Sequence, residues 1–273
     1  MNRGFMDRYD DEMKANEGPI PQSCLNRGVT EDERFLKTPE REDAAFLHTD
    51  PWRVFRIMGE FVQGFDNLAG IGPAVTLFGS ARTTEKDPVY GSAVEVARLL
   101  GEAGFSIITG GGPGFMEAGN RGAHEAGVRS IGLNIELPFE QYVNRYVDVP
   151  LQFRYFFVRK TMFVKYASAF VIFPGGFGTL DELFESLTLI QTAKIKNFPI
   201  VLFGSDFWSG LLRWMEERLV AEGKICPEDL DLIKILDDPL EVRDLILTAM
   251  QGADFQIEKE ERARRTTQEV LRK

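Results

Sequence analysis

Short apolar runs alternate with stretches of helical spacing along most of this chain, and no other pattern limits its fold as strongly. The runs are AVTLFG (74–79), FSIITG (105–110), SIGLNI (130–135), AFVIFP (169–174) and PIVLFG (199–204). Strands that are apolar throughout are typical of parallel sheets covered by helices. The helical patterns fall at 94–100, 116–126, 156–166, from about 180, at 207–219 and at 239–250. We therefore predict an α/β fold, a Rossmann-like doubly wound parallel sheet with helices on both faces.

Composition divides the chain into three predicted segments. Residues 1–45 are rich in charged and polar side chains and are expected to form a mobile or loosely docked arm. Residues 46–252 are predicted to form a single nucleotide-binding domain. It begins with a predicted helix from Pro51 to about Gly70, and the alternating pattern follows this helix. Residues 253–273 form a charged tail to which we assign no chemistry.

Charge and hydropathy exclude several classes of function. A formal net charge of −10 argues against a nucleic-acid-binding protein, because binding the phosphate backbone of a nucleic acid needs an excess of Lys and Arg. The longest apolar runs fall far short of the roughly 20 residues that cross a bilayer, so we expect no membrane contact. The first residues lack the apolar stretch of a secretory signal, which predicts a cytoplasmic protein. The two cysteines, Cys24 and Cys226, indicate neither a disulfide framework nor a metal site.

Glycine-rich turns follow three of the predicted strands, where ligands of open parallel sheets bind. After the first strand, Ser80 and Arg82 are candidates for binding a phosphate or carboxylate, although tight turns also use such residues for geometry alone. After the second, TGGGPGFME (109–117) includes Gly111, Gly112 and Gly114, whose backbone N–H groups can face an anion. This turn does not match the G-x-G-x-x-G dinucleotide fingerprint, so neither NAD nor FAD is predicted.

The third turn, PGGFGTLDE (174–182), gives the strongest signal. Its glycines and the start of the following helix form a predicted anion cradle from Gly175, Gly176, Gly178 and Thr179. No lysine follows the loop as in a Walker A motif, so a monophosphate fits better than a triphosphate with magnesium. Glu182 has two interpretations. It completes a capping box with Thr179, or it orients water or sugar hydroxyls beside the ligand.

A basic helix precedes the strand that leads into this loop. It carries Arg159 and Lys160 within RYFFVRKTM (154–162). Such residues are often solvated on an amphipathic helix. An arginine near a glycine-cradled phosphate can also make bidentate, charge-assisted bonds that lysine cannot make.

Together, GGGPGFMEAGNRGA, FVRKTMF and PGGFGTLDELFE resemble the LOG family of cytokinin riboside 5′-monophosphate phosphoribohydrolases over residues 73–250. The resemblance implies that Arg159 and Glu182 are the catalytic pair and that the third turn binds phosphate. It also implies a homodimer or higher homo-oligomer, for which the aromatic helix 153–166 offers a face, and a ligand site without metal or other cofactor. Further residues implied to line that site are Ser80, Gly111, Gly112 and Met116.

The substrate implied by the resemblance is a nucleoside 5′-monophosphate, cleaved to free base and ribose 5-phosphate. Asp181 stands where family motifs have Glu, and the arm and tail are additions, so the base stays open among cytokinin-type adenine, adenine and pyrimidine. Members are often labelled lysine decarboxylases, but no histidine precedes a lysine here as expected around a pyridoxal phosphate Schiff base. The alternative function is a non-catalytic carrier of a nucleotide or of molybdenum cofactor.

Overall fold

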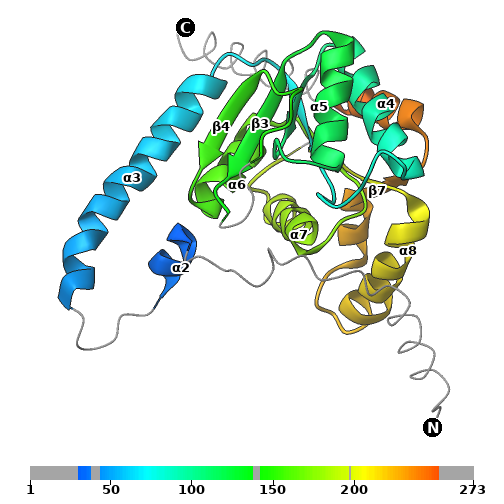
Figure 1. Cartoon of the computed structure of the whole chain (residues 1–273). Coiled ribbons are helices and arrows are strands. Elements are labelled where there is room, and N and C mark those ends of the chain that lie inside the picture. The colour runs from blue at the N-terminus through cyan, green and yellow to red at the C-terminus, as the bar shows by residue number, and fades with distance from the viewer. Residues whose placement is uncertain (1–29, 38–43, 138–141, 197, 252–273) are drawn as a thin grey trace, which may run out of the picture.

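A seven-stranded parallel sheet forms the centre of the protein (Figure 1). The structure, a computed structural model, describes residues 30–37, 44–137, 142–196 and 198–251. The strand order is β4-β3-β2-β1-β5-β6-β7, and every neighbouring pair is parallel. The strands are β1 (Ala74–Phe78), β2 (Ser106–Thr109), β3 (Ser130–Ile135), β4 (Val149–Phe153), β5 (Ala169–Ile172), β6 (Ile200–Phe203) and β7 (Ile233–Leu236).

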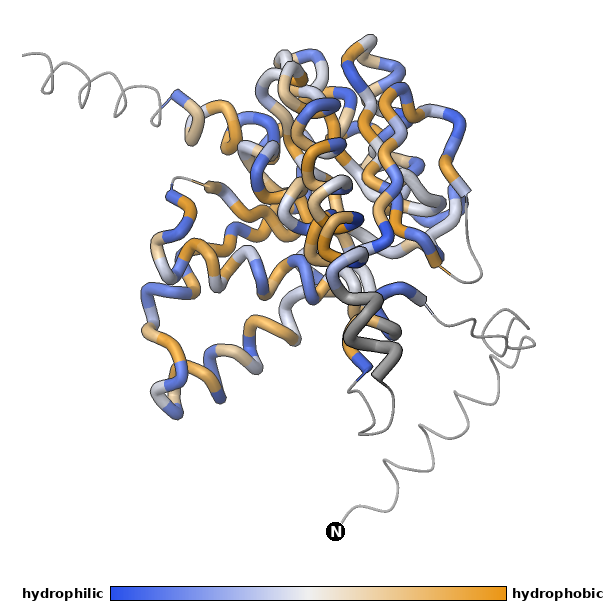
Figure 2. Tube along the Cα trace, turned by 90° about the vertical axis from the view of Figure 1, so that its left-hand side faces the viewer, coloured by the Kyte–Doolittle hydropathy of each residue, from blue (hydrophilic) through white to orange (hydrophobic). Residues whose placement is uncertain are grey.

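The predicted doubly wound α/β fold is confirmed, and helices cover both faces of the sheet. One face packs against α3 (Ala44–Leu68), α6 (Phe156–Tyr166), α7 (Phe177–Gln191) and α8 (Ser205–Trp214). The other packs against α4 (Pro88–Glu102), α5 (Phe115–Ala126) and a helix over 239–251. Figure 2 shows hydrophobic residues concentrated where these layers meet. Within the part of the chain described, no helix is both long and apolar enough to span a membrane.

Strands β4 and β7 were not predicted, and both lie at the edges of the sheet. An edge strand has one neighbour and exposes some of its side chains, so its sequence lacks a continuous apolar run. In β4, the sequence VPLQF buries Leu151 and Phe153 while Pro150 and Gln152 stay exposed. The central strands β1, β2, β5 and β6 are buried along their whole length, as their sequences predicted.

Two helices fall in or near the segment predicted as a polar arm. The short helix α2 (Glu31–Leu36) docks at the start of α6, where the Phe35 ring contacts the rings of Tyr155 and Phe157. Helix α3 begins at Ala44, so Pro51 lies inside it and not at its start. Residues 1–29, 38–43 and 252–273, which include most of the arm and all of the tail, lie outside the described residues. The division into arm, domain and tail stays a prediction.

Candidate active site

The three glycine-rich turns meet where the strand order reverses. Strands β1 and β5 are neighbours, but the chain leaves β1 toward α4 on one face and leaves β5 toward α7 on the other. This divergence opens a crevice beyond their carboxyl ends. Backbone bonds join the turns: Ser80 N–H donates to Pro174 O at 3.0 Å, and Phe115 N–H donates to Ser80 O at 3.1 Å.

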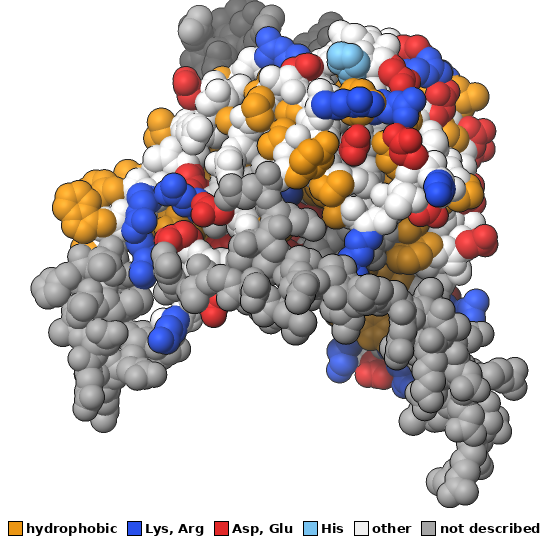
Figure 3. Space-filling view, in the orientation of Figure 1, with side chains coloured by type: hydrophobic (Ala, Val, Ile, Leu, Met, Phe, Trp, Pro, Cys, Tyr) orange, Lys and Arg blue, Asp and Glu red, His pale blue; other side chains and the backbone are white. Residues whose placement is uncertain are grey.

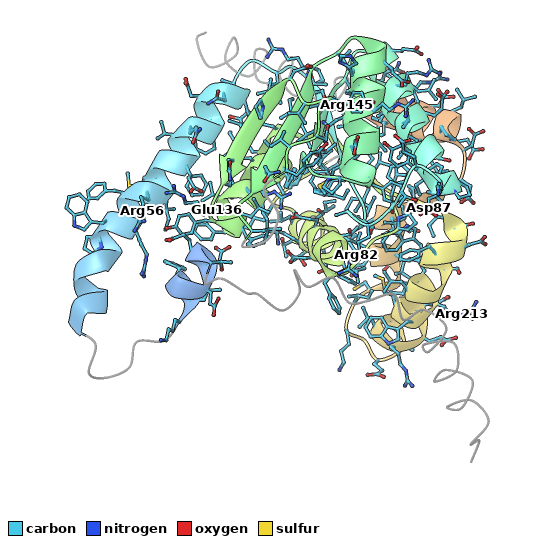
Figure 4. All side chains as sticks on the ribbon, viewed as in Figure 1. Arg56, Arg82, Asp87, Glu136, Arg145 and Arg213 are labelled. Carbon is cyan, nitrogen blue, oxygen red and sulfur yellow. The ribbon has the colours of Figure 1, made fainter. Side chains whose placement is uncertain are left out.

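The crevice contains a pocket of about 660 Å³. It is lined by eight of the predicted site residues, which come from four separate parts of the sequence. They are Ser80, Arg82, Met116, Arg159, Gly176, Gly178, Thr179 and Glu182. Figure 4 shows Arg82 beside α7 at the open side of the domain.

Four predicted glycines do not line the pocket, and three of them, Gly111, Gly114 and Gly175, have a structural reason to be glycine. Gly111 and Gly114 have positive φ angles of 72° and 69°, which side chains rarely adopt. A Cβ on Gly114 would lie 2.4 Å from Ser80 O, and one on Gly175 would lie 2.1 Å from Thr179 Oγ1. Gly112 O accepts a bond from Asn144 Nδ2 at 3.0 Å. Their roles in ligand binding stay predictions.

Gly176 and Gly178 are different, because nothing in the described part of the chain requires glycine at either position. Neither has a positive φ angle, and a Cβ built on either meets no atom within 4 Å. Both line the pocket. Glycine is costly in a helix, and Gly178 lies in the first turn of α7. The space left open beside this backbone therefore faces the pocket, where a ligand can approach it closely.

The start of α7 presents backbone donors to the pocket. The helix begins at Phe177, earlier than the predicted start near Leu180, and its N-cap is Gly176 with no side-chain cap. Leu180 N–H makes a helical bond to Gly176 O at 3.0 Å. The N–H groups of Phe177, Gly178 and Thr179 precede it and have no intrahelical acceptor. The capping-box interpretation of Thr179 and Glu182 is therefore wrong, since both lie within the helix.

Glu182 lies in the pocket wall with a side chain that is almost fully buried, at 7% exposure. Burial raises the pKa of its carboxyl from the usual 4.5 to about 7. The cations of Arg159 and Lys160 lower this pKa, and the neighbouring carboxylates of Glu185 and Asp181 raise it. A carboxyl with a pKa near 7 exchanges protons readily at neutral pH, as a general acid or base must.

Arg159 reaches the same pocket from α6, and three contacts fix its side chain. Its Nε donates to Leu133 O at 2.7 Å, and its guanidinium carbon lies 4.9 Å from the centre of the Phe163 ring. Its Nη2 lies so close to Gly110 that a Cβ there would meet it at 2.4 Å. Burial lowers the pKa of Arg159 to about 10, and the Glu182 carboxylate opposes this shift. The guanidinium therefore keeps its charge at neutral pH.

Lys160 does not line the pocket, and its side chain pairs with two acidic residues of α7. Its Nζ lies 3.0 Å from Asp181 Oδ2 and 2.5 Å from Glu185 Oε2, and its side chain is only 14% exposed. These two acidic residues flank Glu182 on the same helix. The predicted role of Lys160 in phosphate binding lacks support from this position, because its charge is already paired.

Several residues around the site were not predicted from the sequence. Buried Asn120 accepts from Thr109 Oγ1 at 2.6 Å and from Asn144 Nδ2 at 2.8 Å. Asn144 also bonds Gly112, so this network holds the second glycine turn in place. The rings of Phe156 and Phe177 line the pocket, and Phe177 is 92% exposed. Asn120 lies within GGGPGFMEAGNRGA, and Phe177 is the variable position of the third turn.

Sequence comparison with known proteins identifies the family of this chain. The sequence profile of a family described as possible lysine decarboxylases matches residues 116–246. A probable cytokinin riboside 5′-monophosphate phosphoribohydrolase of Arabidopsis thaliana, LOG6, is 27% identical over 156 residues, covering 56% of this chain and 77% of that protein. Another with the same description from Oryza sativa subsp. japonica, LOGL3, is 30% identical over 149 residues, covering 54% of this chain and 68% of that protein. The chain belongs to the LOG family.

Solved structures similar to this LOG-family chain include two that concern molybdenum cofactor. One is the molybdenum cofactor binding protein from Rippkaea orientalis, with 22% identity, a TM-score of 0.48, and coverage of 65% of this chain and 96% of that one. The other is the molybdenum cofactor carrier protein from Chlamydomonas reinhardtii, with 22% identity, a TM-score of 0.48, and coverage of 66% and 98%.

Proposed function

We propose that this protein is a phosphoribohydrolase that converts a nucleoside 5′-monophosphate and water to a free base and ribose 5-phosphate. The observation that carries the proposal is the convergence of Arg159 and Glu182 on one pocket at the start of α7. Family membership supports the same reaction class, because the curated relatives are described as phosphoribohydrolases.

The phosphate is proposed to bind the N-terminus of α7. The N–H groups of Phe177, Gly178 and Thr179 and the positive end of the helix dipole favour an anion there. Glu182 follows Phe177 by five residues, which is roughly 7.5 Å along the helix axis. That spacing is about the length of a ribose phosphate, so a phosphate at the helix start brings the anomeric carbon near the Glu182 carboxylate.

Glu182 is proposed to act on the attacking water. Cleavage of an N-glycosidic bond passes through an oxocarbenium-like state, which a carboxylate stabilises. The carboxylate accepts a proton as the water oxygen bonds to the anomeric carbon, and the bond to the base nitrogen breaks. The departing nitrogen gains one proton, so the sum is substrate plus water. Arg159 holds the phosphate or the sugar in register and limits the charge cost of the buried carboxylate.

The experiment for this proposal is a product analysis with a panel of substrates. Purified protein is incubated with AMP, CMP and isopentenyladenosine monophosphate, and free base is measured by chromatography. We expect base release from at least one monophosphate and none from the matching nucleoside, which lacks the phosphate that α7 would bind. Binding without turnover across the panel would contradict the proposal and favour the alternative, a nucleotide or cofactor carrier.

The Gly178→Ala variant separates ligand binding from stability. Alanine is expected to stabilise the first turn of α7 by about 0.5–1 kcal/mol, because the site has room for its methyl group. The same methyl group would stand where the phosphate approaches the backbone, so KM is expected to rise at least about tenfold, the equivalent of about 1.4 kcal/mol. Gly91→Ala is the matched control, since Gly91 also lies in a helix with nothing near its Cβ position. An unchanged KM in Gly178→Ala would argue against a phosphate at this turn.

Lys160→Met tests how Glu182 is kept ionised. Removing this cation leaves Asp181 and Glu185 unpaired beside Glu182, which raises the pKa of Glu182 further. Fewer molecules then carry the carboxylate at low pH, so the ratio of kcat/KM at pH 6 to that at pH 9 is expected to fall about tenfold. Lys165→Met, an exposed change on the same helix, is expected to leave the ratio unchanged. An unshifted pH profile in Lys160→Met would contradict this role.

A further inference from the structure

The helix that carries Arg159 begins without a cap of its own. Its N-cap, Tyr155, makes no side-chain capping bond, and no acidic residue lies in the first turn of α6. The first helical bond of α6 joins Arg159 N–H to Tyr155 O at 3.2 Å. This leaves four N–H groups without an acceptor in the helix, those of Tyr155, Phe156, Phe157 and Val158. Their acceptors must come from elsewhere in the protein or from water.

The charge of Arg159 makes this helix start less favourable still. A helix carries a partial positive charge at its N-terminus, so cations are favoured in the last turn and disfavoured in the first. Arg159 is the fourth residue of α6, and its burial removes most of the water that would screen its charge. Phe156 and Arg159 both lie in this first stretch of the helix, and both line the pocket. Fraying of the helix start would displace both from the pocket wall.

Two carboxylates from the preceding helices supply acceptors for this helix start. From α3, Glu60 accepts from Arg154 N–H through both oxygens, at 3.2 and 3.1 Å, and from Tyr155 N–H at 3.4 Å. From α2, Asp32 accepts from Phe156 N–H. Burial raises the pKa of both carboxyls, whereas the bonds from these N–H groups lower it and so favour the charged forms. Two acidic side chains therefore lie at the positive end of α6, where the helix dipole stabilises negative charge.

Further contacts hold α2 and α3 in place against α6. The charged groups of Glu31 on α2 and Arg56 on α3 lie 3.9 Å apart. At the end of α6, Tyr166 OH donates to Phe65 O of α3 at 3.2 Å. Figure 3 shows acidic and basic side chains gathered over α2 and the neighbouring part of α3. Helix α3 thus contacts α6 at both of its ends, and α2 is tied to α3 and to the start of α6.

We propose that Asp32 and Glu60 are positioning residues, which hold the first turn of α6 so that Arg159 stays in the pocket wall. Neither side chain lines the pocket, so both act through the helix and touch no substrate. Both precede residues 116–246, the part of the chain that matches the family profile. Their role in catalysis rests on the proposed function of the pocket, whereas their capping contacts do not.

The first test measures the caps without any substrate. Asp32→Ala with Glu60→Ala, which we call the uncapped variant, removes the acceptors of three N–H groups. Hydrogen–deuterium exchange over 154–160 is expected to be at least about tenfold faster than in wild type, with no change over α5. If the uncapped variant does not fold, Asp32→Ala alone takes its place, since α2 is a short helix at the surface. Unchanged exchange over 154–160 would overturn the proposal.

The second test shows whether the caps act through Arg159. The uncapped variant is expected to lower kcat/KM about tenfold, because a small displacement of a charged group in the pocket weakens its contact with the substrate. In Arg159→Met protein the same two changes are expected to lower kcat/KM at most about twofold, since the group that they position is already gone. A loss of similar size in both backgrounds would show a merely structural role and overturn the proposal.

Two matched variants complete this comparison. Asp32→Asn with Glu60→Gln keeps an acceptor oxygen at each position and is expected to stay within about threefold of the wild-type kcat/KM. Glu33→Ala with Asp66→Ala removes one exposed acid from each of the same two helices and is expected to match wild type. A loss in this exposed pair equal to that of the uncapped variant would assign the effect to net charge and contradict the capping role.

Failure of the caps can be told apart from failure of the proposed function. If wild type releases no base from any monophosphate, the proposed function fails, and the same comparison is made on the Kd for AMP. The uncapped variant is expected to weaken AMP binding about tenfold in otherwise wild-type protein and at most about twofold in Arg159→Met protein. Equal weakening in both backgrounds would overturn the positioning role as well.

Discussion

Replacing Glu182 with Gln is expected to lower kcat about 10³-fold while the Kd for the nucleoside monophosphate changes only a few-fold. Gln has nearly the same shape, so the pocket keeps its form and the N-terminus of α7 keeps its donors. The amide cannot accept a proton from water, and it carries no charge to stabilise the oxocarbenium-like state. Single-turnover base release and equilibrium binding of AMP measure the two quantities separately.

The same variant has a built-in control for folding. Because the folded-state pKa of Glu182 is raised from 4.5 to about 7, ionising it in the folded protein costs about 3 kcal/mol. Below pH 4.5 both the folded and unfolded states are protonated and the cost is absent. It grows as the pH rises toward 7 and is complete above that. Glu182→Gln is therefore expected to be more stable than wild type at pH 8. An inactive variant that is also unfolded would leave catalysis unassigned, and a fully active one would contradict the role of Glu182.

Arg159→Met is expected to lower kcat/KM about 10²–10³-fold, because it removes a fixed charge from the wall of the pocket. Two effects act together. The substrate loses a charge-assisted contact, and the pKa of Glu182 rises because the cation that lowers it most is gone. Arg159→Lys is expected to recover little of the lost kcat/KM. The planar guanidinium of Arg159 donates to Leu133 O through Nε and still has other donors for the pocket, whereas lysine has a single nitrogen.

The measurement for Arg159 is a pair of pH profiles with a matched control. Arg98→Met removes an arginine that pairs with Glu95 and Glu102 on the surface of α4, away from the pocket. It is expected to keep wild-type kinetics. Arg159→Met is expected to lose rate at every pH and to lose most at low pH, where Glu182 is protonated. Kinetics like those of wild type in Arg159→Met would remove this residue from the proposed mechanism.

The sequence predicted the central architecture because buried parallel strands have a distinctive composition. Runs such as AFVIFP and PIVLFG face helices on both sides and can be apolar throughout, so β5 and β6 were found. The helix 156–166 was predicted with the bounds of α6. The edge strand β4 was missed because Pro150 and Gln152 interrupt its apolar pattern. The early start of α3 was missed because Pro51 is typical of a helix start, whereas here it lies inside the helix.

Site residues could be predicted where a short sequence motif is enough to identify them. A glycine turn after a buried strand marks the edge where ligands bind, and Gly176, Gly178 and Glu182 do line one pocket. Distant packing was not predictable. The pairing of Lys160 with Asp181 and Glu185 depends on how α6 meets α7, and the bond between Asn120 and Asn144 depends on how α5 meets the loop after β3. Neither relation has a signature in residue spacing alone.

The central claim is that a phosphate at the start of α7 aligns a ribose with Glu182 and Arg159. A crystal structure of the Glu182→Gln variant with an uncleaved nucleoside monophosphate tests it most directly. The account predicts the phosphate within hydrogen-bond distance of the N–H groups of Phe177, Gly178 and Thr179, with the anomeric carbon facing residue 182 and Arg159. A phosphate bound elsewhere, or a ribose turned away from residue 182, would contradict it.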